Sequence, residues 1–275
     1  MSRCPTRKEV ISKVSDTIFS GRVLNNSHRG DVVEMMVAMA LGAEWCFVGL
    51  GWHPWDLQRG AGDDRVRIQV KQSAALQLWG PTKVPTVSLN WSARPPSYFR
   101  RDNPDELIEA EGWFCELFVV GIHSEKDAAI ADQCDPQQWR FSVIPTPDLK
   151  EGAKSITVNR IIARWPPVEW GQLKQSVDKA VRVLALAQYE FWQWDDHGLI
   201  RCKRDGNGGA YPEVWRGNRW ETGTAYAVDA ITGMGEDPYS CGECAEPLSI
   251  EQAQEYAAAN QVDLLGPNQS KKNSR

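Results

Sequence analysis

The sequence predicts an α/β protein in which a mixed sheet is flanked by helices. Residues 65–72 alternate strictly between apolar and polar side chains, as a half-buried strand does. The stretch from Val32 to Leu41 is almost wholly apolar and reads as a buried helix. Two more apolar runs, 114–122 and 139–144, resume as strands, and an amphipathic helix follows at 173–190. Strands interleaved with helices in this way are typical of a sheet covered by helices.

The first 60 residues supply two helices and a strand. An amphipathic helix is expected over residues 8–19, on the surface of something larger. The next helix, capped by Ser27 or Asp31, has hardly any polar face and should be buried all round, with Gly42 as its terminator. Trp45 to Gly51 then reads as a short buried strand.

A turn at residues 60–64 joins two segments that should form a hairpin. In the second, the apolar side chains of 65–72 face one way and Arg67, Gln69 and Lys71 face the other. A helical turn is possible from Ala74 to Trp79, and the proline-rich stretch 81–104 predicts an irregular excursion.

The chain is expected to divide near residue 195. Residues 1–195 form the α/β domain, and residues 196–275 form a C-terminal appendage, where the sequence becomes rich in Gly with interspersed Arg and Trp. The appendage has little periodicity before a polar helix near 250–259, and the polar, basic tail from residue 268 should be disordered.

Composition excludes several classes. With 42% hydrophobic and 24% charged residues over 275 positions, the chain is globular, and disorder, collagen and coiled coil are excluded as its main state. No apolar run approaches the roughly 20 residues of a membrane helix and no signal peptide opens the chain, so a cytoplasmic protein without membrane contact is expected. Seven Cys, an odd number, fit reduced thiols. Because the net charge is −5, a polyanion such as DNA would have to bind at a local basic patch.

One group of polar residues in the predicted hairpin suggests a catalytic site. Asp56 and Gln69 lie at nearly equal distances from the turn at Gly62-Asp63, so a hairpin would make them cross-strand neighbours. Lys71 follows on the same face as Gln69. An acid, a carbonyl oxygen and an ammonium on one side of a sheet suit a magnesium-dependent phosphodiesterase, which needs hard oxygen ligands and a cation beside the attacking water.

Glu34 is the sole charge within the apolar helix. A carboxylate in such surroundings must be paired, protonated or bound to a metal. The alternative is that it lies in the first turns of the helix, where the dipole favours an acid without further purpose.

Together these residues resemble the PD-(D/E)XK nuclease superfamily, and Gln69-Val70-Lys71 is similar to the variant in Mrr-type restriction endonucleases. The matching residues, Glu34, Asp56, Gln69 and Lys71, occur in the family's order of helix and strands. The resemblance implies a restriction-endonuclease-like fold and DNA cleavage, in a restriction or other defence system. It implies Mg²⁺ or Mn²⁺ held by Asp56, Glu34 and Gln69, Lys71 orienting or deprotonating the nucleophile, and a homodimer for cutting both strands.

Two departures from the family pattern matter. Pro54-Trp55-Asp56 displaces the Pro by one position, and Gln69 is neutral where the family usually has a carboxylate. The rival interpretation is therefore a catalytically silent nucleic-acid-binding module on the same fold.

Further nucleic-acid contacts are predicted at Gln72 and Ser73, which follow the motif, and at Arg29, which precedes the apolar helix. Capping, solvent-facing or loop roles are the alternatives for these three. The appendage adds a basic and aromatic stretch in which Arg204, Arg216 and Arg219 are the candidate contacts. The interleaved Asp205, Glu213 and Glu221 fit a solvated charged face equally well.

A zinc site is the last candidate. Cys241 and Cys244 have the spacing of a zinc knuckle, and His197 with Cys202 could complete four ligands, although the second pair is badly spaced. Free thiols are the alternative, and a zinc-stabilised partner-binding protein is the third function considered. His53 is either a metal or substrate contact or a packed strand histidine.

Overall fold

The computed structural model describes residues 3–48, 54–61, 65–81, 85–89, 98–99, 107–108, 112–194, 198–203, 212–222 and 245–266. Contacts divide the chain into two compact units, Met1–Val181 and Arg182–Arg275. The division falls within helix α4 (Leu173–Leu186), upstream of the boundary expected near residue 195. Each unit is described by itself.

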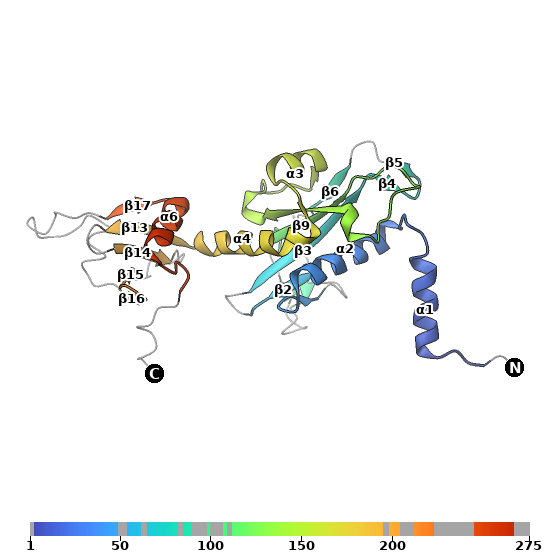
Figure 1. Ribbon diagram of the computed structural model, residues 1–275, viewed down its shortest axis with the longest axis horizontal. Helices are drawn as coiled ribbons and strands as arrows, with labels where there is room; N and C mark the ends of the chain where they lie inside the picture. Colours follow the sequence, from blue (N-terminus) through green and yellow to red (C-terminus); the bar gives the residue numbers. More distant parts are fainter. Residues whose placement is uncertain are drawn as a thin grey trace, which may run out of the picture. The chain divides into compact units, whose positions relative to one another are not determined.

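Unit 1 is built on a six-stranded mixed sheet, so the predicted α/β class is confirmed at that level. Its strand order is β1-β2-β3-β9-β10-β12, and among these strands only β3 and β9 are parallel neighbours. Figure 1 labels β2, β3 and β9 of this sheet. The strands are β1 (Cys46–Phe47), β2 (Leu57–Arg59), β3 (Val66–Ala74), β9 (Leu117–His123), β10 (Trp139–Pro145) and β12 (Val168–Glu169). Short 3-10 helices flank them: η2 (Pro136–Gln138), η3 (Thr146–Asp148) and η4 (Trp170–Gln172).

Helix α2 (Asn26–Leu41) packs on one face of this sheet along β3. The approach is close at Gly121 of β9, where a Cβ would lie 2.8 Å from Val33 Cγ1. The helix ends at Gly42, as expected, and Gly42 has a φ of 82° that favours glycine. Its N-cap is Asn25, whose side chain accepts a hydrogen bond from the Ser27 amide, so the predicted capping by Ser27 or Asp31 was wrong.

The expectation that α2 is buried all round was also wrong. Met35 and Met39 are 45% and 68% exposed, whereas Val33, Met36, Val37 and Leu41 are buried. The helix packs on the sheet along one stripe only. Its outer face is apolar at Met35 and Met39, but these side chains are not buried by the described part of the chain.

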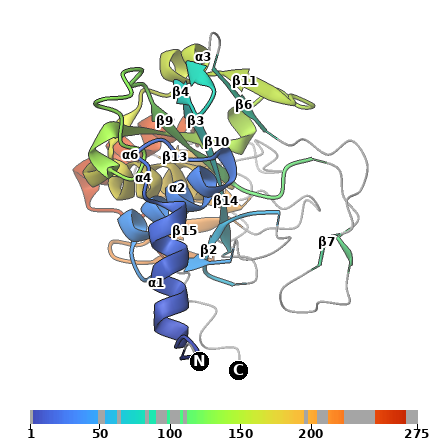
Figure 2. The same ribbon diagram turned by 90° about the vertical axis from the view of Figure 1, so that its right-hand side faces the viewer.

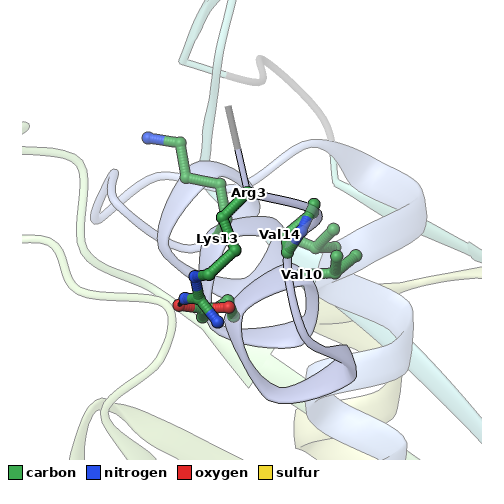
Figure 3. Close-up of a pocket in the computed structure, with 6 residues that line it drawn as sticks. Arg3, Val10, Lys13 and Val14 are labelled. Atoms are coloured by element: carbon green, nitrogen blue, oxygen red, sulfur yellow. Dashed lines mark hydrogen bonds and ion pairs between the residues drawn. The ribbon is translucent and has the colours of Figure 1, made fainter. Parts of the chain in front are cut away.

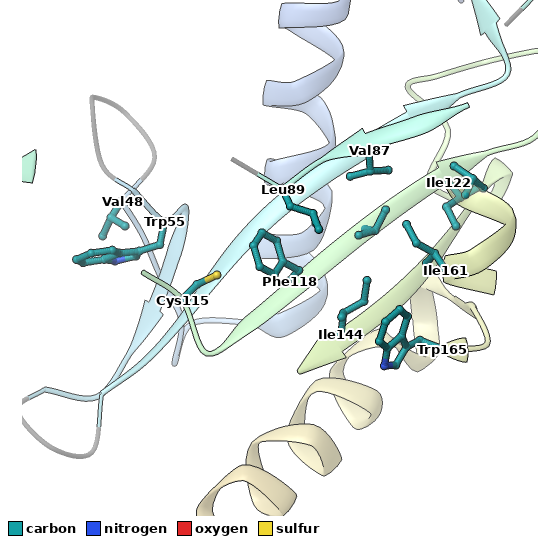
Figure 4. Close-up of a cluster of buried hydrophobic side chains, with 12 residues drawn as sticks. Val48, Trp55, Val87, Leu89, Cys115, Phe118, Ile122, Ile144, Ile161 and Trp165 are labelled. Carbon is teal, nitrogen blue, oxygen red and sulfur yellow. The ribbon is translucent and has the colours of Figure 1, made fainter. Parts of the chain in front are cut away.

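The opposite face of the sheet is covered by α3 (Val158–Arg164) and by a two-stranded sheet of β6 (Thr86–Ser88) and β11 (Ser155–Thr157). Phe118 from β9, Val87 from β6 and Ile161 from α3 meet in this core, which Figure 4 shows. Helix α3 has no signal in the sequence analysis, and β6 lies within the stretch expected to be irregular.

The segment after β3 forms a hairpin instead of the helical turn considered for Ala74–Trp79. Strands β4 (Leu76–Gln77) and β5 (Gly80–Pro81) pair antiparallel, and Gly80 has a φ of 113°. A second small pair is β7 (Tyr98–Phe99) with β8 (Leu107–Ile108).

Helix α1 (Arg7–Ile18) confirms the predicted N-terminal amphipathic helix (Figure 2). Thr6 and Glu9 form a capping box at its start. None of its residues is buried among the described residues, and Val10 and Val14 line an open pocket beside Arg3 and Lys13 (Figure 3).

Unit 2 contains a five-stranded antiparallel sheet with α6 (Ile250–Asn260) against it. Its order is β16-β15-β14-β13-β17, and the strands are β13 (Tyr189–Trp194), β14 (Gly198–Lys203), β15 (Glu213–Trp215), β16 (Trp220–Thr222) and β17 (Glu246–Leu248). Phe191, Leu199 and Trp220 pack with Ala253 and Ala257 of α6. The sequence analysis predicted α6 but not the sheet.

Across the described residues, no helix is both long enough and apolar enough to cross a lipid bilayer.

Candidate active site

The hairpin between β2 and β3 brings Asp56 beside Gln69. Leu57 pairs with Ile68, and the same register, continued by one residue, sets Asp56 opposite Gln69. The Asp56 amide donates to the Ile68 carbonyl at 2.8 Å, which extends the ladder to Asp56 itself. The turn-based expectation from the sequence therefore agrees with the observed pairing.

Beyond this point β2 leaves β3, and the Asp56 side chain takes the place of a strand partner. Its Oδ2 atom accepts a hydrogen bond of 2.6 Å from the Val70 amide. Among the described residues, β2 pairs with β3 only from Val66 to Ile68. The carboxylate is thus held beside Val70, at a position where no described strand pairs with β3 on that side.

The faces of β3 follow from its partners. Gln72 pairs with Gly121, the residue against which α2 packs, and its side chain bonds to Arg29 and Asn26 of α2. Gln72 therefore faces α2, and alternation turns Gln69 and Lys71 to the opposite face. There they lie beside Phe118 and Val120, their register partners on β9.

Glu34 approaches from the other side of the sheet because it belongs to α2. Its carboxyl group nevertheless interacts electrostatically with both Asp56 and Lys71. The structure therefore places Gln69 and Lys71 on one face of β3 with Asp56 opposite Gln69, and it places Glu34 on α2 within electrostatic reach of Asp56 and Lys71.

Burial raises the pKa of Glu34 to about 8, and repulsion from Asp56 and Asp31 adds to the shift, while Lys71 opposes it. No ion pair or hydrogen bond of the Glu34 side chain to another described residue is formed within bonding distance. With a pKa of about 8, the half-buried Glu34 carboxyl group is mostly protonated at neutral pH, and a cation bound beside it would favour release of that proton.

Burial is also the largest cause of the pKa shifts of Asp56 and Lys71. It raises the pKa of Asp56, against the Val70 hydrogen bond and Lys71, which lower it. It lowers the pKa of Lys71, against Asp56, Cys115 and Glu34, which raise it. The site therefore holds acids that are less acidic than usual and an amine that gives up its proton more readily than usual.

Cys115 lies under the site and has no signal in the sequence. Cys115 is 4% exposed, its Sγ atom lies 3.9 Å from Thr146 Oγ1, and burial raises the pKa of the thiol to about 12. A thiol with that pKa stays neutral at physiological pH, so it serves as packing beneath Gln69 and not as a nucleophile.

The residue before Asp56 is held by a second arrangement that sequence reasoning missed. Trp55 is 2% exposed, and the Arg67 guanidinium lies 5.1 Å from its ring centre. Glu116, immediately before β9, accepts hydrogen bonds from both the backbone amide and the side chain of Arg67. This contact ties β2, β3 and β9 together beside the carboxylate.

The oxygen ligands available to a divalent ion are few. No group of three or more His, Cys, Asp or Glu side chains converges within the described part of the chain. Asp56 and Glu34 are the two carboxyl groups that could bind such an ion, and Gln69, half-buried and without a side-chain hydrogen bond to a described residue, could add an amide oxygen. Mixed carboxylate and amide oxygens suit Mg²⁺ or Mn²⁺, which keep several waters in addition.

Arg29 does not lie on the surface, where the sequence analysis expected a phosphate contact. It is 1% exposed and donates to the side chains of Asn26, Gln72 and Gln77, at 2.7, 2.7 and 2.8 Å, and to the Leu24 carbonyl. Its guanidinium joins α2 to β3 and β4. Gln72 is consequently occupied within the protein as well, and it does not face outward as a donor.

Ser73 is 8% exposed and faces the same side of β3 as Lys71. In unit 2, Arg219 pairs with the neighbouring Glu221, and the Arg216 side chain is exposed. For Arg216 and Arg219, a nucleic-acid contact and a solvated charged face therefore both stay open.

Several predicted site residues lie outside the described ranges, namely His53, His197, Arg204, Cys241 and Cys244. Cys202 is the one zinc candidate within them, and it is half-buried on β14.

Comparisons with protein-family models, with curated proteins and with solved structures found no match to this chain.

Proposed function

We propose that this protein is a Mg²⁺- or Mn²⁺-dependent endonuclease that hydrolyses DNA phosphodiester bonds on a restriction-endonuclease-like fold. The observation that carries the proposal is the placement of Asp56 opposite Gln69, with Lys71 next on the same face and Glu34 interacting with both charges. The order of helix and strands and the uncovered edge of β3 agree with the resemblance to the PD-(D/E)XK superfamily.

Asp56, Glu34 and the Gln69 carbonyl oxygen would hold the divalent ion. Such an ion supplies Lewis acidity to a phosphate oxygen and lowers the pKa of a water at the site. The fit rests on the donor set: two carboxyl groups whose pKa values are raised by burial, with the Lys71 ammonium acting on both, and one amide oxygen from Gln69.

Lys71 would act on the nucleophile and on the phosphate. Burial lowers its pKa, which brings the ammonium closer to the range in which a side chain exchanges protons at neutral pH. As an ammonium it donates to a phosphate oxygen and offsets charge that builds up there. The Val70 amide keeps the Asp56 carboxylate oriented while this occurs.

Cutting both DNA strands would need two such sites, so a homodimer in a restriction or other defence system belongs to the proposal. Light scattering coupled to size-exclusion chromatography tests the dimer directly. A fold alone does not determine function, and the biological setting rests on the family resemblance.

The deciding experiment is an assay of the full chain on plasmid and mixed oligonucleotides with Mg²⁺ or Mn²⁺, with and without a chelator. We expect cleavage that Lys71→Ala and Asp56→Ala each abolish. Lys179→Ala and Glu151→Gln, at exposed positions away from the site, are the matched controls and should cleave like the native protein. Cleavage that survives both site variants would refute the proposal.

A catalytically silent nucleic-acid-binding module is the second candidate. It is favoured by the neutral Gln69 and by the lack of a third carboxylate in the described part of the site. DNA binding without metal-dependent cleavage, unchanged in Lys71→Ala, would establish this function instead.

A further inference from the structure

A cavity of about 370 Å³ opens at the carboxyl ends of the parallel strands β3 and β9. Ser73 lines it from β3, Ile122 from β9, and Val158, Asn159 and Ile162 from α3. Cavities of this size with mostly apolar walls and a few convergent polar groups are typical of small-ligand sites. This cavity is separate from the carboxylates of the candidate active site.

Lys71 does not line the cavity, but it lies on the same strand as Ser73, which does. Ser73 follows Lys71 by two residues, so their side chains share one face and stand about 7 Å apart along the strand. That spacing is within the length of one nucleotide. A phosphate beside Lys71 would therefore carry a neighbouring base toward this cavity.

One polar group in the cavity wall lacks a partner. Ser73 is 8% exposed as a residue, and its side chain forms no hydrogen bond with another described residue. The Ser73 oxygen is still accessible from the cavity, so the hydroxyl can both donate a hydrogen bond to a ligand there and accept one from it.

The other residues that line the cavity indicate which class of ligand it could bind. Ile122 and Val158 are buried apolar walls, and Ile162 is 40% exposed at the cavity although it is apolar. The Asn159 amide offers a donor and an acceptor, and the Lys126 ammonium is exposed and offers a cation. Apolar walls with an amide suit a heteroaromatic ring, and the ammonium suits the phosphate attached to it.

We propose that this cavity binds the base of a nucleotide next to the phosphate that Lys71 contacts. The inference rests on the proposed function for its substrate, because it places a base displaced from the DNA stack beside the cleaved bond. Enzymes that take a base out of the duplex bind it between apolar side chains and read its edge by hydrogen bonds.

Binding of isolated nucleotides tests the cavity without metal or cleavage. The four deoxynucleoside 5′-monophosphates and inorganic phosphate are titrated into the full chain and followed by calorimetry. We expect at least one nucleotide to bind, and to bind at least about tenfold more tightly than inorganic phosphate. No nucleotide binding at about 10 mM, or equal binding of inorganic phosphate, would overturn the inference.

Substitutions in the cavity lining test whether the nucleotide binds in this cavity. Ser124→Phe should fill the mouth of the cavity from an exposed position, and Asn159→Leu should remove the amide. Each should weaken nucleotide binding about tenfold. Ala163→Phe, also exposed and on α3 but outside the cavity lining, is the matched control and should leave binding unchanged. Unchanged binding in both cavity variants would overturn the assignment.

Plasmid cleavage by the same variants separates the two proposals. Nucleotide binding that Ser124→Phe weakens, in a protein that cleaves no DNA, supports the cavity and refutes the nuclease. Cleavage by the native protein that Ser124→Phe and Asn159→Leu leave unchanged refutes the cavity and supports the nuclease.

Discussion

The Asp56 carboxylate accepts a 2.6 Å hydrogen bond from the Val70 backbone amide, and this bond continues the pairing of β3 after β2 has ended. The side chain therefore has two roles that can be separated. It satisfies an amide in a half-buried position, and it supplies negative charge to the candidate metal site.

Asp56→Asn should keep the first role and lose the second, because an amide oxygen still accepts from Val70. Its free energy of unfolding should stay within about 1 kcal/mol of the native value, whereas Asp56→Ala should lose about 1–3 kcal/mol by leaving the amide unpaired. Urea unfolding of the two variants provides the comparison. Equal loss in both would show that the hydrogen bond adds nothing beyond the charge.

Glu34 should make stability fall as pH rises. Its pKa is about 8 in the folded protein against an ordinary value of 4.5, so between these values the folded state holds a proton that the unfolded state has released. The free energy of unfolding then decreases with pH, by no more than about 1.4 kcal/mol per pH unit from this one group.

Glu34→Gln removes the titration and should flatten that slope between pH 5 and 8. Urea unfolding at three pH values in this window, without divalent ions, measures both proteins. Parallel pH profiles for the native protein and the variant would contradict the raised pKa.

Arg29 should be required for folding stability. Arg29→Lys cannot reproduce the planar set of donors, and it would leave acceptors on Asn26, Gln72 or Gln77 unpaired in the interior. We expect a loss of about 2–4 kcal/mol in the free energy of unfolding. Arg7→Lys, on the exposed helix α1, is the control and should change it by less than about 0.5 kcal/mol.

Two glycines should respond in opposite directions to alanine. Gly121→Ala would place a Cβ 2.8 Å from Val33 Cγ1 and 3.2 Å from the Trp139 ring, and should destabilise by about 1–3 kcal/mol. Gly30, within α2, has no heavy atom within 4 Å of its Cβ position, so Gly30→Ala should stabilise by about 0.5–1 kcal/mol.

A double-mutant cycle with Val33→Ala tests the cause of the Gly121 effect. Removing the Val33 methyl groups should recover part of the loss in Gly121→Ala, giving a coupling of at least about 0.5 kcal/mol. Additive effects would mean that the contact with Trp139 alone explains the destabilisation.

The strand β3 and its hairpin were predictable because their signals are local. Alternation from Val66 to Val70 identifies the strand, and the position of the turn determines which residue faces Asp56. The face that Lys71 occupies follows from the same alternation. The candidate site was therefore largely visible in about 15 residues of sequence.

What the sequence did not reveal depends on tertiary contact. Arg29 and a surface arginine have the same local pattern, and only the approach of Gln72 and Gln77 from other elements makes Arg29 internal. The hairpin after β3 depends on Gly80 adopting a positive φ, which a glycine permits but does not require. In unit 2, β15 and β16 are three residues each, too short for a period to be recognised.

Every acceptor around Arg29 is a carbonyl oxygen, of a side-chain amide or of the backbone, so its positive charge is bonded but not neutralised by any described group. Away from water, such a charge is screened less by dissolved salt than an exposed one is. His123 already responds to it, since burial and then Arg29 lower the pKa of its imidazole. A chain with a formal net charge of −5 thus contains, inside unit 1, a cationic centre whose effect on neighbouring groups such as His123 should persist at ionic strengths that weaken surface lysines.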